Sequence, residues 1–138
     1  MMRKLLFLFA VILIPAFSFS QTILDKIANH AKELGLKRIY DAKFELQSKS
    51  MASVFTTLSP GDYKVFGLGG YSEVKDIDLF IYNKDTNALI AKENTKLDGI
   101  SIVNFTIEKT TKVWIKIYNR KSAPELEYYD CYLLITKY

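Results

Sequence analysis

The segment Asp76-Ile77-Asp78-Leu79-Phe80-Ile81-Tyr82 decides the fold class, because its residues alternate between two kinds. Ile77, Leu79 and Ile81 stand two residues apart, so they lie on one face of an extended strand. The segment 112–119 repeats this period, with Val, Ile and Ile alternating with Trp, Lys and Tyr. Strands of an antiparallel sheet that cover one side of a core show this pattern. The alternation therefore predicts a mainly β protein.

Six further segments show the same period of two, and most are bounded by turn residues such as Pro60-Gly61. Strands that follow one another at about 8–12 residues, without helices between them, are typical of an antiparallel sandwich or barrel. Eight strands suit a jelly roll. We therefore expect an eight-stranded antiparallel jelly-roll β-sandwich over residues 40–138, with strands at 41–48, 51–58, 63–68, 76–82, 88–93, 100–107, 112–119 and 126–138.

One amphipathic helix is predicted ahead of the sandwich, over residues 22–34. Its apolar positions recur at spacings of three and four and form a single stripe. Gly35 follows the stripe, where a left-handed helix cap is expected. We assign residues 21–39 to this helix and a linker, and expect the helix to pack across one end of the sandwich or on an open face. The stripe consists of Ile23, Leu24, Ile27, Ala28, Ala31 and Leu34.

Residues 1–20 have the layout of a secretory signal peptide. Arg3 and Lys4 precede an uncharged run over 5–17, and the small residues Ser18 and Ser20 suit a cleavage site. The run is shorter than the ~20 apolar residues that a membrane span needs. We expect cleavage after Ser20, with Ser18 as the alternative, and an exported protein that is periplasmic or secreted and has no membrane span after cleavage.

Composition and charge exclude several classes of protein. The chain has 138 residues, 49% of them apolar, and a formal charge of +4, which excludes a disordered chain. Removal of residues 1–20 takes away two basic residues, and no Arg cluster suited to phosphate remains, so we expect no nucleic-acid partner. The single His30 and the absence of a Gly-x-Ser-x-Gly motif argue against a Ser/His/Asp hydrolase. The single Cys131 reads as a small buried apolar residue.

A family resemblance rests mainly on Asp76-x-Asp78-Leu79 and on the turn before Tyr63. Together with the alternating segments at 89–93, 111–117 and 132–135, this succession resembles the bacterial pre-peptidase C-terminal domain. That family is a jelly-roll β-sandwich and includes the collagen-binding modules of clostridial collagenases. The resemblance covers about residues 55–135. It departs from the family pattern at 111–114, where Gly-x-Tyr is usual, and at Glu93, where Asp is common.

Asp76, Asp78 and Glu93 are the candidate metal ligands. Residues two apart on a strand point to one face, so the two aspartates can present paired carboxylates. Together with Glu93 or loop carbonyls they would offer the oxygen ligands that Ca²⁺ prefers. The resemblance also implies calcium, because it stabilises the fold of the collagen-binding relatives. The alternative is that the two aspartates cap the start of a strand and face solvent.

Aromatic residues beside a lysine form the candidate ligand surface. Exposed aromatics supply rigid contact area with a polar tip, which suits a peptide, a glycan or a collagen-like ligand. The alternative is that these rings belong to the core or to cross-strand pairs. The candidate residues are Trp114, Lys116, Tyr118, Tyr128 and Tyr132.

These observations predict a non-catalytic exported β-sandwich that binds an extracellular or periplasmic partner, either a protein, a peptide or a glycan. The alternative is a structural or chaperone-like accessory to a secreted enzyme, as the family's occurrence as a peptidase tail implies. A small hydrolase is a third reading. It would need the paired carboxylates to stand ~5–10 Å apart across a cleft, and the sequence offers no sign of one.

Overall fold

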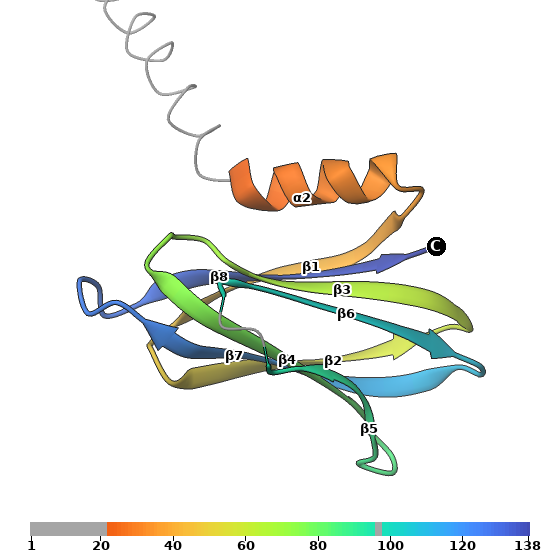
Figure 1. Cartoon of the computed structure of the whole chain (residues 1–138). Helices are drawn as coiled ribbons and strands as arrows, with labels where there is room; N and C mark the ends of the chain where they lie inside the picture. The colour runs from red at the N-terminus through yellow and green to blue at the C-terminus, as the bar shows by residue number, and fades with distance from the viewer. Residues whose placement is uncertain (1–21, 96–97) are drawn as a thin grey trace, which may run out of the picture.

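The computed structural model describes residues 22–95 and 98–138 and consists of two β-sheets and one helix (Figure 1). The predicted signal peptide and its cleavage sites lie outside the described residues. Within the described part of the chain, no helix is long and apolar enough to span a membrane.

The eight strands form two four-stranded antiparallel sheets. The first sheet has the order β1(Lys37–Leu46), β8(Tyr129–Lys137), β3(Gly61–Gly69), β6(Ile100–Ile107). The second sheet has the order β2(Ser50–Leu58), β7(Thr111–Ser122), β4(Val74–Asn83), β5(Leu89–Glu93). Six of the seven connections between consecutive strands cross from one sheet to the other, and only β4 and β5 are direct neighbours. This is the jelly-roll order, so the predicted fold is confirmed.

The main core lies between the sheets and is built from the inward face of each strand. Ile77, Leu79 and Ile81 of β4 are fully buried there, as their alternation predicts. The inward residues of β7 and β8 are buried in the same cluster, and they are Val113, Ile115, Ile117, Tyr129, Cys131, Leu133 and Ile135.

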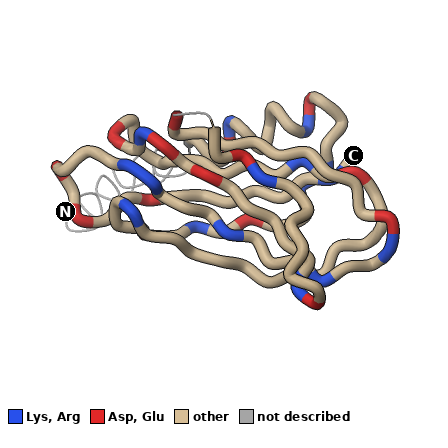
Figure 2. Tube along the Cα trace, turned by 60° about the horizontal axis from the view of Figure 1, so that its bottom comes forward, with Lys and Arg blue, Asp and Glu red and all other residues tan. Residues whose placement is uncertain are grey.

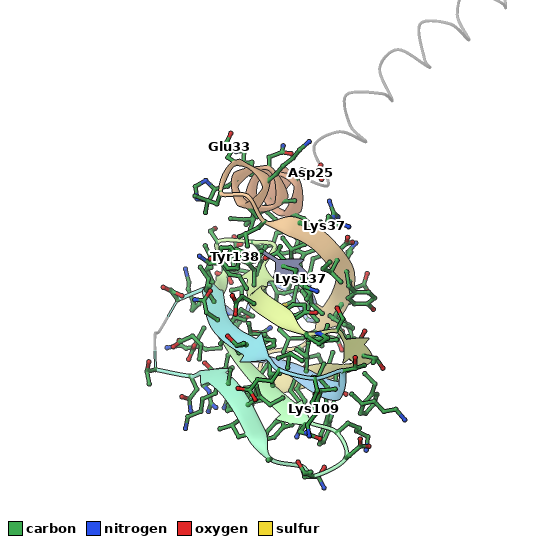
Figure 3. The ribbon with its side chains drawn as sticks, turned by 90° about the vertical axis from the view of Figure 1, so that its right-hand side faces the viewer. Asp25, Glu33, Lys37, Lys109, Lys137 and Tyr138 are labelled. Atoms are coloured by element: carbon green, nitrogen blue, oxygen red, sulfur yellow. The ribbon has the colours of Figure 1, made fainter. Side chains whose placement is uncertain are left out.

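A second core lies between the first sheet and the helix α2(Thr22–Glu33). Figure 1 shows α2 above this sheet, and Figure 3 shows Glu33 pointing away from it. The helix thus takes the open face, one of the two positions expected. The second core is made of buried residues from α2, from the sheet and from the segment that joins α2 to β1. These residues are Leu24, Ala31, Leu36, Phe66, Leu68, Tyr132 and Leu134.

The helix ends in a cap formed around Gly35, whose φ of +81° is left-handed. The Leu36 N–H donates to the Ala31 carbonyl at 2.9 Å, and the Gly35 N–H donates to the Lys32 carbonyl at 3.0 Å. These two bonds define a Schellman motif, which turns the chain into β1. Because the cap ends the helix at Glu33, Leu34 lies beyond it and is 52% exposed, although its spacing places it on the buried stripe.

Several strand ends differ from the sequence-based expectation, and two of the strand starts have a clear cause. The last strand begins at Tyr129, three residues later than expected, because the preceding loop folds over the Tyr129 hydroxyl. That hydroxyl donates to the Ala123 carbonyl and accepts the Leu126 N–H at 3.1 Å. The strand β1 begins at Lys37, earlier than expected, because it pairs with β8 from Lys137 onward.

The arrangement leaves the two sheets with unlike outer faces. The outer face of the first sheet lies beneath α2, whereas the second sheet lies on the opposite side of the molecule (Figure 1). Figure 2 brings this opposite side forward and shows both basic and acidic positions along the chain there. The outer face of the second sheet, which α2 does not cover, is therefore the open surface on which we seek a ligand site.

Candidate functional site

An array of aromatic rings crosses the outer face of the second sheet. Trp114 of β7 lies opposite Phe55 of β2 and opposite Tyr82 of β4 in the strand register. The Phe55 and Trp114 ring centroids are 5.8 Å apart with an interplanar angle of 16°, and those of Tyr82 and Trp114 are 5.7 Å apart at 43°. Phe80 continues the row, with its ring centroid 6.5 Å from that of Tyr82. We call Phe55, Phe80, Tyr82, Trp114 and Tyr118 the aromatic face.

The rings point outward because their strand neighbours are committed to the core. Val113, Ile115 and Ile117 are fully buried, and a strand that faces inward at these positions must face outward at Trp114 and Tyr118. The one-residue alternation of β7 therefore sets both the core and the candidate site.

Cationic side chains lie over the faces of these rings. The Lys116 Nζ is 3.9 Å from the Trp114 ring centroid and 5.2 Å from that of Tyr82. The Arg120 Cζ is 4.8 Å from the Tyr118 centroid. Cation–π contacts of this kind contribute about 0.5–1 kcal/mol each at exposed sites, so they hold the rings and the charges in a defined arrangement.

The surface is open and shallow. Phe55 is 59% exposed and Met51 is 54% exposed, both at outward positions of the edge strand β2. A hollow of about 280 Å³ is lined by Met51, Phe80, Tyr82, Lys116, Tyr118 and Arg120. A second hollow, of about 500 Å³, includes Phe55, Lys84 and Lys112. Open, shallow hollows of this kind are better suited to binding the surface of a macromolecule than to enclosing a small molecule.

Three of the five predicted ligand-surface residues come together on this face, namely Trp114, Lys116 and Tyr118. Tyr128 is 51% exposed but lies in the loop before β8, and the described residues give it no ring contact with the aromatic face. The placement of Tyr132 on a ligand surface is wrong. It is only 6% exposed, because α2 covers the outer face of β8.

Sequence reasoning missed Phe55, Phe80 and Met51 as members of this surface. Their alternation marks them as outward-facing, but only the strand register places Phe55 beside Trp114. That register joins strands that are distant in the sequence, and no local pattern encodes it.

Asp76 and Asp78 are buried, with 5% and 0% of their surface exposed. The Arg120 Nε donates to the Asp78 Oδ2 at 2.5 Å, in a pair whose arginine side is half exposed. The Oδ1 atoms of both aspartates are buried and have no hydrogen-bond partner among the described residues. The solvent-facing alternative for these residues is therefore wrong.

Burial raises the pKa of Asp76, and the nearby charge of Asp78 raises it further. The Arg120 guanidinium opposes this effect but is already paired with Asp78. The pair thus holds two carboxyl groups against one cation, an arrangement that favours a proton on Asp76.

Glu93 does not join the two aspartates. It lies opposite Leu79 in the register of β5 with β4, and its Oε2 accepts the Thr95 hydroxyl at 3.2 Å. Over residues 22–95 and 98–138, no three His, Cys, Asp or Glu side chains are placed to hold a metal ion. The three-residue calcium site is not assembled there, and calcium binding stays a prediction. A thermal melt with and without EDTA tests it, and an unchanged midpoint would contradict it.

Cys131 is a buried free thiol in the main core, as expected for a small apolar residue. Burial raises its pKa to about 12, with a smaller contribution from Asp130. Since the thiolate is the nucleophile, this cysteine is unreactive at neutral pH.

No family model and no curated protein matches the chain. Several solved structures are similar to it. The pre-peptidase C-terminal domain of the collagenase from Bacillus anthracis aligns with a TM-score of 0.52 at 12% identity, covering 70% of this chain and 87% of that one. CorA, a surface-associated copper-binding protein from Methylomicrobium album BG8, aligns with a TM-score of 0.55 at 6% identity, covering 71% and 93%.

The mitogen from Yersinia pseudotuberculosis is a third such structure, with a TM-score of 0.51 at 18% identity over 72% of this chain and 85% of that one. At these identities the likeness is one of fold alone. It confirms, at the level of fold, the resemblance to the pre-peptidase C-terminal domain that the sequence indicates. The chain is therefore a jelly-roll sandwich of the kind found in that domain.

Proposed function

We propose that the protein is an exported, non-catalytic binding module whose ligand site is the aromatic face. The observation that carries this proposal is the arrangement at Trp114. Its ring lies between Phe55 and Tyr82, beneath the Lys116 ammonium, on the sheet that α2 does not cover. The expected partner is an extracellular or periplasmic protein or glycan.

The physical case rests on preorganisation. Rings that contact one another and carry a cation have already lost much of their rotamer freedom, so a ligand does not have to order them. Aromatic side chains also provide a large share of the energy in binding surfaces. CorA, which shares this fold, is a surface-associated protein, and this supports export for a protein of this fold.

The buried carboxylates support a non-catalytic reading. A glycosidase acid and base must reach a sugar from both sides of a cleft. Asp76 and Asp78 are instead buried together, and Asp78 is bound by Arg120. His30 lies exposed on α2, on the opposite side of the molecule from the aromatic face.

The test compares two exposed aromatic residues that differ in place. F55A removes a ring of the aromatic face, and Y128A removes a similarly exposed ring outside it. Immobilised mature protein and both variants are offered to envelope extracts and a glycan array, and each retained species is then identified and titrated. We expect F55A to lose binding about tenfold, equal to about 1.4 kcal/mol, and Y128A to keep it.

Equal binding by F55A and the native protein would contradict the proposal, and so would equal loss in both variants. The accessory role remains the second candidate, because a solved neighbour is a domain of a collagenase. A single enzyme that co-purifies stoichiometrically favours that role, whereas retention on a glycan or matrix protein favours ligand binding.

A further inference from the structure

The exposed charges at the strand positions of the outer face of the second sheet are of one sign, whereas the turn after β4 adds an exposed Asp85 next to Lys84. Its outward strand positions include Lys92 beside Phe80, Lys112 beside Thr57, and Lys116 and Arg120 on β7. The acidic outward positions, Asp76 and Asp78, are buried. Asp78 is paired with the half-exposed Arg120, and Asp76 lies buried beside it. The strands of this face therefore present positive charge to solvent.

Four of the five rings of the aromatic face have a cation over one face. Lys116 lies over Trp114 and Tyr82, Arg120 lies over Tyr118, and the Lys84 Nζ is 5.5 Å from the Phe55 ring centroid. Stacking of a neutral sugar on these four rings would compete with the cations. The chemistry offered to a ligand is instead a set of cations beside exposed apolar groups.

The exposed apolar groups are Phe55 and Met51, which have no polar tip to bond sugar hydroxyls. Both lie on the same face of the edge strand β2, with the outward-facing Ser53 between them. A protein segment with carboxylates next to apolar side chains complements both the cations and the apolar side chains of this surface. Its carboxylates meet Lys116 and Arg120, and its apolar groups pack on Phe55 and Met51.

We propose that the aromatic face binds an acidic, apolar segment of a protein partner, an inference that rests on the proposed function. Charge complementarity selects an anionic ligand and accelerates its association. Attraction between such exposed charges falls as salt screens them. Binding through this face must therefore weaken with ionic strength, which binding through apolar contact alone would not do.

Three probes separate the alternatives. The first is a twelve-residue peptide of alternating Glu and Leu, and the second is its neutral twin with Gln in place of Glu. The third is polygalacturonate, an acidic glycan. Each is titrated into the mature protein at low and at moderate salt. The fluorescence of Trp114, the single tryptophan, reports binding at the site itself, and amide chemical shifts confirm the location.

We expect the Glu-Leu peptide to bind, with an affinity that falls as salt rises, and the neutral twin to bind at least about tenfold more weakly. K116Q should weaken the peptide several-fold. The matched control is K32Q, which removes an exposed lysine from α2 on the far side of the molecule.

Equal binding of the neutral twin would overturn the inference but leave the aromatic face as the ligand site. Binding of polygalacturonate in place of the peptide would also overturn it, in favour of a glycan. If no probe binds while F55A still loses its envelope partner, the inference fails and the proposed function stands. If F55A keeps that partner, the proposed function fails as well.

Discussion

Asp76 illustrates how one buried carboxyl group links stability to pH. Its pKa is raised by burial and by Asp78, so the fold favours its neutral form. The neutral Asp76 makes its full contribution to the free energy of unfolding at pH values below about 3.9, the pKa of an unfolded aspartate. This contribution is lost as the pH rises through the higher pKa of Asp76 in the folded protein. At neutral pH the folded protein therefore bears the cost of a poorly paired charge.

The substitution D76N should raise the stability of the protein at pH 7. An amide stays neutral at every pH and can donate to the unpartnered Oδ1 of Asp78. We expect a gain of about 1 kcal/mol at pH 7 that shrinks toward pH 4, where the native carboxyl takes up its proton. Thermal unfolding from pH 4 to pH 7 measures it, with E108Q in an exposed turn as the control. A gain that stayed constant with pH would contradict this assignment.

Single residues also mark the limit of prediction from sequence. That Trp114 and Tyr118 share a face follows from their spacing on one strand. That Asp78 binds Arg120 does not, because the pairing of β4 with β7 brings together residues far apart in the chain. The burial of Asp76 and Asp78 was not predicted for the same reason. Their alternation suits a solvent-facing position, and only the surrounding chain makes it a buried one.

At the scale of elements, α2 and its Gly35 cap follow directly from the sequence, whereas the position of the helix does not. An apolar stripe shows that a helix packs on something without identifying the surface. The signal for that surface was present in β8. Tyr132 and Leu134 on one face and Cys131 and Leu133 on the other make this strand apolar on both sides, which is typical of a strand covered on both faces.

The cap at Gly35 should contribute measurably to the docking of α2. A Cβ at this position meets nothing within 4 Å, so the cost of substitution is confined to the left-handed backbone. We expect G35A to lower the free energy of unfolding by about 1 kcal/mol, and G35N by less, because asparagine tolerates this conformation better. Urea unfolding measures both variants. An equal loss in the two would point to a contact of Gly35 rather than to its φ angle.

At the scale of the whole molecule, the first sheet separates two apolar clusters. The main cluster lies between the sheets, and the second lies between the first sheet and α2. The jelly-roll order closes the sandwich through contacts between its own strands, most extensively between β4 and β7, to which α2 does not contribute. The helix should therefore detach at a lower free energy than the sandwich unfolds, as a separate cooperative unit.

The substitution A31D tests this separation, because Ala31 is 1% exposed in the contact between α2 and the sheet. A buried, unpaired charge should displace the helix at a cost of several kcal/mol in local stability. We expect hydrogen exchange to lose protection in α2, while β4 and β7 keep theirs and Trp114 keeps its native fluorescence. The control N29D places the same charge at an exposed position of the helix. Loss of protection throughout both sheets would mean that helix and sandwich form one cooperative unit. Loss of protection in α2 alone would mean that the sandwich, and with it the aromatic face, stays folded when α2 is detached.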